Sequence, residues 1–206
     1  MLPPQCHHRS WFIAATLAIA AQRVAIAGFV YVEGVDGDLS DDRFHPTLLQ
    51  LGAGSNMLVG ADGPSSVPDV PDLDYVTLVV APGFQLERLV LVDADVGGAF
   101  SFIGVESGPI ISTPWDDPDP APLLGWMHYG SADEGHDVLP AIGQGNGAIG
   151  FRGPLPTGTY TLWLMELDGA RPHDYSFEFV VTPIPAPAGV LALGFATLRR
   201  RRARID

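Results

Sequence analysis

The chain reads Gly158-Thr159-Tyr160-Thr161-Leu162-Trp163-Leu164-Met165-Glu166 and, a little later, Tyr175-Ser176-Phe177-Glu178-Phe179-Val180-Val181. Both runs are rich in β-branched and aromatic residues, which favour strands. Similar short runs, separated by Gly, Pro, Asp and Asn, recur between residues 28 and 182 at intervals of roughly ten residues, without a long stretch of helical periodicity. This pattern is typical of an all-β protein built as a β-sandwich. We expect the two quoted runs to form a hairpin.

The remaining strands are expected at residues 29–32, 47–51, 56–59, 74–80, 86–92, 100–106 and 126–129. The second and third of these are expected to pair as a hairpin across Gly52-Ala53-Gly54-Ser55. Residues 137–143 are expected to form a single helical turn, and the Pro- and Asp-rich residues 109–122 an irregular loop. Period-two alternation places Glu166 and Glu178 on strand faces that meet solvent.

Residues 1–27 have the organisation of a secretory signal peptide. A weakly basic start at residues 7–9 precedes an apolar run, and Ala25 and Ala27 form a small-x-small cleavage site. An N-terminal anchor is the alternative, but it requires a longer apolar span. Removal of this segment takes away Cys6, the single cysteine, so the mature protein relies on its core rather than on disulfides.

The C-terminus carries a second targeting signal, which has three parts. Pro183 to Pro187 should form a stiff extended spacer, because each proline fixes φ and removes a backbone N–H. The uncharged apolar residues 188–198 follow, and then Arg199, Arg200, Arg201 and Arg202. At about 1.5 Å per residue, the apolar helix covers roughly half of a hydrocarbon core of about 30 Å. The arginines would stay on the cytoplasmic face, with the bulk of the protein outside. The alternative is a membrane-grazing or disordered basic tail.

The charge of the chain is unevenly distributed. The whole sequence has a formal net charge of −13. Between Glu33 and Glu178, four arginines stand against twenty-three carboxylates, a charge of −19, and lysine is absent from the sequence. Such an acidic surface repels phosphate backbones, which argues against nucleic-acid binding.

The tail resembles the PEP-CTERM sorting signal of Gram-negative bacteria. In that signal a Pro-Glu-Pro element, a transmembrane stretch and an Arg cluster are recognised by a membrane peptidase called exosortase. Here the element reads Pro185-Ala186-Pro187, with Ala in place of Glu. The resemblance implies export, transient association with the inner membrane, and processing by an exosortase-type partner. It places the mature protein in the cell envelope or an extracellular matrix.

The body of the chain also resembles a known family. Four segments are similar to the strand and turn segments of pre-peptidase C-terminal-type domains in PEP-CTERM proteins: residues 74–83, 102–105, 153–163 and 175–181. This resemblance implies a small, antiparallel, jelly-roll-like β-sandwich and carries no catalytic signature. The expected organisation is a signal peptide at 1–27, a β-sandwich domain at 28–182 and a sorting signal at 183–206.

A calcium site is one hypothesis for the acidic residues. Asp36, Asp38 and Asp41 lie in a Gly-containing run, and Asp72 and Asp74 precede a strand. Hard carboxylate oxygens are the ligands that Ca²⁺ prefers, and extracellular Ca²⁺ fills even weak sites. The spacing differs from that of an EF-hand loop, so a solvated acidic loop is the alternative.

Other chemistries find less support. His128 and His136 lie near Asp133, Glu134 and Asp137 in the sequence, without the tight ligand spacing of zinc sites. Ser101 has no Gly-x-Ser-x-Gly elbow around it, and a glycosidase pair would need Glu166 and Glu178 in a cleft. His173, beside Pro172 and Asp174, is expected in a loop. We therefore expect a protein that is not an enzyme and needs no cofactor.

Aromatic residues suggest one further role. A sugar-stacking platform on one sheet face is a hypothesis for Tyr31, Trp115, Trp126, Tyr129, Tyr160 and Trp163. The alternative is that these residues are core, which applies to Trp163 above all, whereas Trp115 is expected to be the more exposed. The sequence thus favours an exported, non-enzymatic structural or interaction protein of the envelope or an exopolysaccharide matrix. The alternative is a Ca²⁺-dependent carbohydrate-binding or adhesive module.

Overall fold

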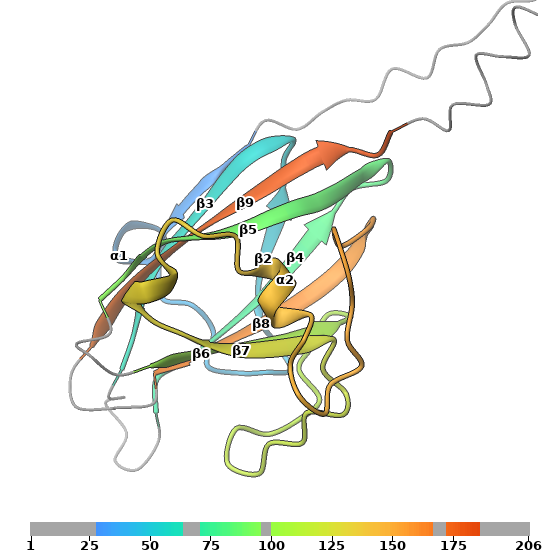
Figure 1. The fold of residues 1–206 in the computed structure, drawn as a ribbon. Coiled ribbons are helices and arrows are strands. Elements are labelled where there is room, and N and C mark those ends of the chain that lie inside the picture. Colours follow the sequence, from blue (N-terminus) through green and yellow to red (C-terminus); the bar gives the residue numbers. More distant parts are fainter. Residues whose placement is uncertain (1–27, 64–70, 96–99, 167–171, 186–206) are drawn as a thin grey trace, which may run out of the picture.

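The computed structural model describes residues 28–63, 71–95, 100–166 and 172–185 (Figure 1). The predicted signal peptide and its cleavage residues, and the sorting signal from Ala186 onward, lie outside this part of the chain. In the described ranges, no helix has the length and apolar character that crossing a membrane requires.

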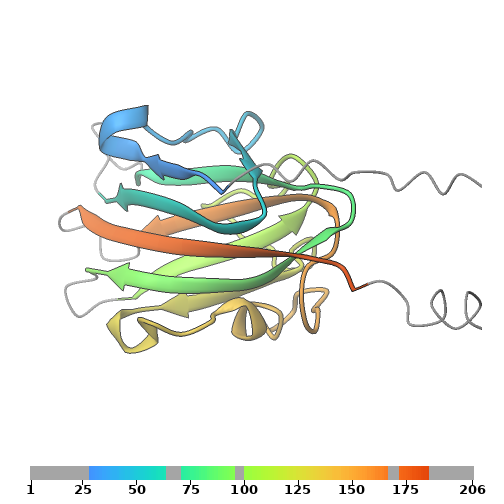
Figure 2. The same cartoon turned by 90° about the horizontal axis from the view of Figure 1, so that it is seen from above.

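The described chain is mostly β and forms two sheets (Figures 1 and 2). One sheet has the strand order β1-β3-β9-β5, and the other has the order β2-β4-β8-β6-β7. The strands are β1 (Val30–Val32), β2 (Thr47–Leu51), β3 (Gly54–Asp62), β4 (Leu73–Val80), β5 (Phe84–Ala94), β6 (Ser101–Ser107), β7 (Gly125–Tyr129), β8 (Gly158–Glu166) and β9 (His173–Pro183). Each strand predicted from the sequence is present, with ends that differ by a few residues.

Both sheets are mixed rather than antiparallel throughout, which corrects the predicted sheet type. β1 pairs in parallel with β3, and β2 pairs in parallel with β4, whereas the other pairs are antiparallel. The two predicted hairpins are wrong. β2 and β3 lie in different sheets, and so do β8 and β9. Alternation along a strand shows which residues share a face but not which sheet the strand joins.

The side chain of Asn56 explains why β2 and β3 form a corner instead of a hairpin. Its buried carboxamide accepts a hydrogen bond from the Gly52 N–H at 2.8 Å and donates to the Gly52 and Phe179 carbonyls at 3.0 and 3.1 Å. These bonds satisfy backbone groups that would otherwise be buried without partners. Gly54 has a φ of 92°, which a residue with a Cβ rarely adopts. The link therefore passes from one sheet to the other.

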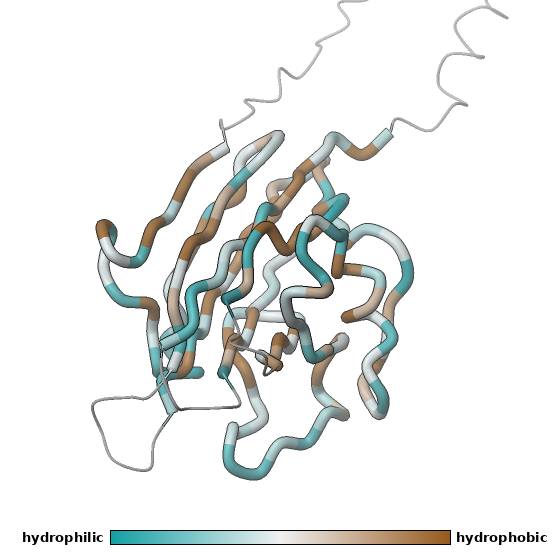
Figure 3. The backbone as a smooth tube through the Cα atoms, turned by 60° about the vertical axis from the view of Figure 1, so that its left-hand side comes forward, coloured by the Kyte–Doolittle hydropathy of each residue, from teal (hydrophilic) through white to brown (hydrophobic). Residues whose placement is uncertain are grey.

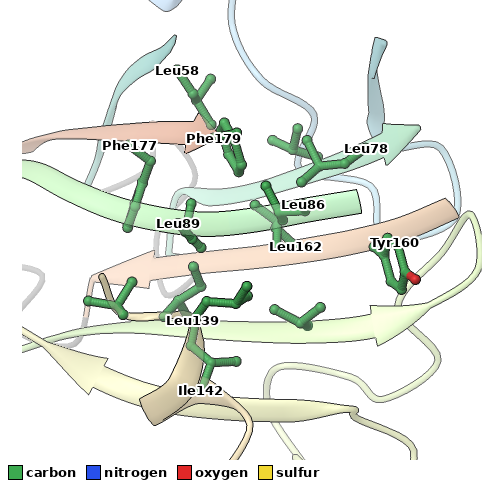
Figure 4. Packing of buried hydrophobic residues seen from close by; sticks show 14 of the residues in the cluster. Leu58, Leu78, Leu86, Leu89, Leu139, Ile142, Tyr160, Leu162, Phe177 and Phe179 are labelled. Carbon is green, nitrogen blue, oxygen red and sulfur yellow. The ribbon is translucent and has the colours of Figure 1, made fainter. Parts of the chain in front are cut away.

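The two sheets face each other across a hydrophobic core (Figure 4). Leu78 of β4 and Phe177 and Phe179 of β9 are among its fully buried side chains. Hydrophobic and polar residues alternate along the strands (Figure 3). Helix α2 (Leu139–Ile142) packs its first and last residues into the same core and confirms the helical turn predicted at 137–143. The short helix α1 (Glu33–Asp36) and the 3₁₀ turn η1 (Ser131–Asp133) were not predicted.

The described domain begins and ends at the same end of the sheets (Figure 2). Gly54, at the start of β3, lies opposite Val181 of β9. β9 continues through Pro183, and the Ile184 N–H donates to the Gly83 carbonyl at 2.9 Å. The predicted domain boundary at residue 182 therefore falls inside the last strand. The opposite end holds the start of β9, at His173, and the ends of β3 and β8.

Candidate functional site

The outer face of the five-stranded sheet carries a second apolar cluster, separate from the core between the sheets. Its buried members are Leu73, Tyr75, Phe102, Ile111, Leu123 and Trp163. Residues 108–124, which connect β6 and β7 and contain the irregular loop predicted at 109–122, supply Ile111 and Leu123. The loop is fixed by backbone bonds from Ile111 N–H to Arg43 O at 3.1 Å and from Leu124 N–H to Val105 O at 2.7 Å. A sheet face that would otherwise meet water is therefore covered.

A cavity of about 260 Å³ opens in this covered face, and we call it the aromatic pocket. Its walls on the sheet are Phe102, Trp126, His128, Trp163 and Met165, and the β6–β7 loop adds Pro118, Asp119, Pro120 and Leu123. A concave, mostly apolar hollow with a few polar groups is the usual form of a small-molecule site. The aromatic pocket is therefore the first candidate for a ligand-binding site.

Strand register brings the pocket walls together. Phe102 of β6 lies opposite both Met165 of β8 and His128 of β7, and Gly104 lies opposite both Trp163 and Trp126. A Cβ at Gly104 would come within 3.1 Å of the Phe102 ring, so the missing side chain leaves room for the aromatic rings. The centroids of Phe102 and Trp163 are 4.7 Å apart, edge to face. The pocket thus stands on rigid strands rather than on loops alone.

Two indole N–H groups belong to the pocket wall. Trp126 is half-buried, and its Nε1–H donates to the Asn146 carbonyl at 3.0 Å. Trp163 is 1% exposed, and its Nε1–H has no hydrogen-bond partner in the described part of the chain. A buried donor without a partner costs about 1–3 kcal/mol. This N–H is enclosed by the protein, so it does not present a donor to the cavity.

A second hollow of about 350 Å³ lies beside the pocket, over β4. Tyr75 and Trp115 line it, and the Tyr75 ring stacks on Trp163 with centroids 6.3 Å apart. Arg43 also lines it and donates to the Ile111 carbonyl at 3.0 Å, which ties the β6–β7 loop to this edge. Burial raises the pKa of Tyr75 above its ordinary value. The two hollows thus share one stacked pair of rings.

A different group of side chains points inward at the end of the sheets opposite Pro183, and we call it the interior polar cluster. It consists of Asp62, Asp74, Ser101, Tyr129, Glu166, His173 and Tyr175, all less than a tenth exposed. These residues come from β3, β4, β6, β7, β8 and β9, so both sheets contribute.

Hydrogen bonds satisfy only part of this cluster. The Tyr175 hydroxyl donates to Asp74 Oδ2 across the two sheets, and the Ser101 hydroxyl donates to Glu166 Oε2, each at 2.6 Å. His173 Nδ1 lies 2.5 Å from the Asp95 carbonyl and 4.0 Å from Glu166 Oε2. Both carboxyl oxygens of Asp62, the Tyr129 hydroxyl and His173 Nε2 lack partners among the described residues.

Burial changes the charge of the two aspartates. It raises the pKa of Asp62 to about 8, and the nearby Glu166 carboxylate adds to this. It raises the pKa of Asp74 to about 9, although the hydrogen bond from Tyr175 acts in the opposite direction. Both groups therefore carry their protons at neutral pH, when they can donate hydrogen bonds as well as accept them.

The five aspartates predicted to bind calcium do not meet at one point. Asp36 accepts the Val32 N–H at 2.7 Å, Asp41 accepts the Leu73 N–H at 3.1 Å, and Asp74 lies in the interior. Burial first, and then the carboxylates of Asp41 and Asp38, raise the pKa of Asp72 to about 6. Within the described ranges, three or more His, Cys, Asp or Glu side chains are nowhere arranged to hold a metal ion. Calcium binding remains a prediction.

The structure also tests the predictions made for Glu166 and His173. Glu166 was expected in solvent and His173 in a loop, and both are wrong, because the two residues are 4% and 1% exposed inside the polar cluster. Asp62 was not singled out. The alternation along β3 could have indicated that Asp62 is buried, since Asn56, Leu58 and Asp62 all lie on its inward-facing positions.

The six aromatic residues proposed as one platform divide among four places. Trp126 and Trp163 line the aromatic pocket, and the half-buried Trp115 lines the neighbouring hollow. Tyr129 and Tyr160 belong to the core between the sheets, and Tyr31 donates from β1 to the Gly37 carbonyl at 2.8 Å. The sequence missed Phe102 and His128, which complete the pocket. Comparison of the chain with protein-family models, with curated proteins and with solved structures found no match.

Proposed function

We propose that this protein is an exported binding module of the cell envelope or an exopolysaccharide matrix, and that its aromatic pocket holds a sugar ring. In this proposal the described domain is a jelly-roll-like β-sandwich. A signal peptide ending at Ala27 exports it, and a PEP-CTERM-like tail from Pro185 to the Arg cluster sorts it through an exosortase-type peptidase.

The observation that carries the binding role is the aromatic pocket itself. Sugar rings have apolar C–H faces and hydroxyl edges, so they match a hollow with aromatic walls and a small number of hydrogen-bonding groups. Trp126 and His128, the less buried rings, offer ring surface, and the His128 ring nitrogens and the Asp119 carboxylate are the hydrogen-bonding groups. Three strands and a proline-rich loop hold these groups, which supports a preformed site.

A binding role is favoured over a catalytic one by the position of the carboxyl groups. A glycosidase needs an acid and a base on either side of the scissile bond. Asp62, Asp74 and Glu166 point into the interior, away from the pocket, and two of them retain their protons near neutral pH. The only carboxylate among the residues lining the aromatic pocket is Asp119.

Calorimetric titration of the exported protein with short soluble gluco-, manno- and chito-oligosaccharides tests the proposal. We expect binding by the wild type and a loss of about tenfold or more in affinity for Trp126→Ala, which corresponds to about 1.4 kcal/mol. Phe100→Ala is the matched control, because Phe100 is 63% exposed and does not line the pocket. If no saccharide binds, or if Trp126→Ala binds as tightly as the wild type, the proposal fails.

The sorting step has its own test. We expect mass spectrometry of the protein exported from an exosortase-containing Gram-negative host to find it without residues 1–27 and without the Arg cluster. Replacing Pro185 and Pro187 together should leave the C-terminal tail attached and keep the protein with the membrane. An exported protein that still carries Arg199 to Arg202 would contradict the sorting proposal while leaving the binding proposal intact.

A further inference from the structure

The rings of the aromatic pocket form a tightly packed group, which we call the box: Phe102 and Trp126 stack at 27°, with centroids 6.1 Å apart, and the other contacts are inclined. Phe102 meets Trp163 at 60°, with centroids 4.7 Å apart, and meets His128 at 59°, with centroids 5.8 Å apart. Trp126 and His128 are inclined at 68°, with centroids 5.4 Å apart. Phe102 and Trp163 are buried in this packing, whereas Trp126 is half-buried and His128 exposed, so the last two rings offer most of the surface that a bound group can touch.

The charges around the box have one sign. Asp119 is the only carboxylate that lines it, and neither Lys nor Arg does so. The whole segment from Glu33 to Glu178 carries a formal charge of −19. Aromatic faces are electron-rich and attract cations within about 6 Å of the ring centroid. The aromatic lining and the charge therefore both favour a positively charged group over a neutral or anionic one.

Asp119 is held at the box by its own loop. Its backbone N–H donates at 2.8 Å to the hydroxyl of Thr113, a buried residue, and its Oδ1 accepts the Ala121 N–H at 3.0 Å. Pro118 and Pro120 flank it and restrict the backbone on both sides. The carboxylate of this exposed residue is therefore positioned next to the rings while its other oxygen remains available in the described structure.

We propose that the aromatic pocket selects a ligand with a protonated amine, and that the sugar it binds is an amino sugar whose nitrogen is not acetylated. The ammonium group lies over the exposed part of the Trp126 ring and faces the Asp119 carboxylate. This inference rests on the proposed function for the sugar ring, and adds the charge of the substituent that the pocket recognises.

The test compares three disaccharides of matched size in calorimetric titrations at low salt: one of glucosamine, its N-acetylated counterpart, and a neutral glucose disaccharide. We expect the glucosamine disaccharide to bind about tenfold more tightly than the other two. The preference should weaken as salt rises, because exposed charges are screened. Asp119→Asn should reduce the preference, whereas Asp117→Asn, which removes an equal charge from the same loop outside the pocket, should preserve it.

Trp126→Ala separates the pocket from general attraction to an acidic surface. We expect this variant to lose the preference for the amine, whereas non-specific attraction would survive the substitution and overturn the inference. Equal binding of the three disaccharides would overturn the inference and leave the proposed function standing. Binding of tetramethylammonium at the pocket without binding of any saccharide would support the cation site and refute the sugar-binding function.

Discussion

The aromatic pocket and the interior polar cluster are built from neighbouring residues of the same strands. At this end of the five-stranded sheet, four strands, β4, β6, β7 and β8, turn a polar residue inward and its apolar or aromatic neighbour outward. The pairs are Asp74 and Tyr75, Ser101 and Phe102, Tyr129 and His128, and Glu166 and Met165. The usual relation between hydrophobicity and direction is largely reversed here.

The comparison shows that a covering loop can decide which face of a sheet is apolar. Outward rings are sheltered because residues 108–124 cross them, and Ile111 and Leu123 pack into the same cluster. Inward carboxyls are tolerated because the facing sheet supplies partners such as the Tyr175 hydroxyl, and because two of them stay protonated. One region is a covered apolar surface that forms the candidate site, and the other is a polar interior maintained by hydrogen bonds and protonated carboxyls.

The largest effect is expected from Trp163→Ala, which removes the centre of the outer cluster. Trp163 contacts the rings of Phe102 and Tyr75 and is 1% exposed, so the substitution should lower the free energy of unfolding by about 3–5 kcal/mol. Urea denaturation measures this. The control Val92→Ala, at a side chain 44% exposed on β5, should change it by less than about 0.5 kcal/mol. A loss below about 1 kcal/mol for Trp163→Ala would show that the outer cluster does not support the fold.

Tyr175→Phe tests the hydrogen bond that joins the two sheets in the polar cluster. Without this hydroxyl the buried Asp74 carboxyl loses its donor, and we expect a loss of about 1–3 kcal/mol in the same assay. The matched control is Tyr160→Phe, because the Tyr160 hydroxyl donates to the Pro156 carbonyl at a partly exposed position. Equal losses for the two variants would refute a special role for the inter-sheet bond.

The pH dependence of stability should reveal the protonated aspartates. Asp62 and Asp74 have pKa values of about 8 and 9 in the folded protein, and an aspartate in the unfolded chain has a pKa of about 3.9. Between these values the folded state binds more protons, so stability is complete at low pH and falls as pH rises towards 8 and 9. The slope should reach about 1.4 kcal/mol per pH unit for each carboxyl.

Asp62→Asn identifies the source of that slope. The variant should flatten the fall in stability between pH 5 and pH 8 by about the share of one carboxyl, whereas Asp117→Asn, at an exposed position, should leave the profile unchanged. Thermal or urea unfolding measured across this pH range provides the readout. A stability that rises with pH over the same interval would show that these carboxyls are ionised in the folded protein.

The smallest effect is expected from calcium. Asp36 and Asp41 already accept backbone N–H groups and Asp74 is enclosed, so added Ca²⁺ should change the free energy of unfolding by less than about 0.5 kcal/mol. The melting temperature with Ca²⁺ and with a chelator measures this. A rise with Ca²⁺ that Asp72→Asn removes would establish the alternative, a Ca²⁺-dependent module, and would place the ion at the surface acids rather than in the polar cluster.

The positions of the strands and of α2 could be predicted because they depend on local pattern. Alternation in residues 74–80 and 175–181, and turn residues between them, are properties of a few neighbouring positions. The assignment of strands to sheets could not be predicted, because it depends on contacts such as the bond from Asn56 to the carbonyl of Phe179, far along the chain. The connection at Gly52-Ala53-Gly54-Ser55 was therefore predicted as a hairpin, whereas it is a corner between the two sheets.

The candidate site was only partly predictable for a related reason. Trp126 and Trp163 could be recognised as aromatic residues on one face, but their meeting requires the shared register opposite Gly104. Glu166 was placed in solvent because charged strand residues usually lie there. Its burial depends on Ser101 of the neighbouring strand, whose hydroxyl donates to the Glu166 carboxylate. The local sequence pattern does not predict that pairing.

Both ends of the described chain lie at the same end of the sheets, and this determines how the domain responds to mechanical force. β1 and β9 flank β3, and tension between Gly28 and Ile184 would pull on the first residue of one and the last residue of the other. Their hydrogen bonds would open one after another instead of sharing the load, so the strands would peel apart at low force. If the domain is tethered at one end only, this tension does not act on it. The opposite end of the sheets, which holds the start of β9, then faces its surroundings.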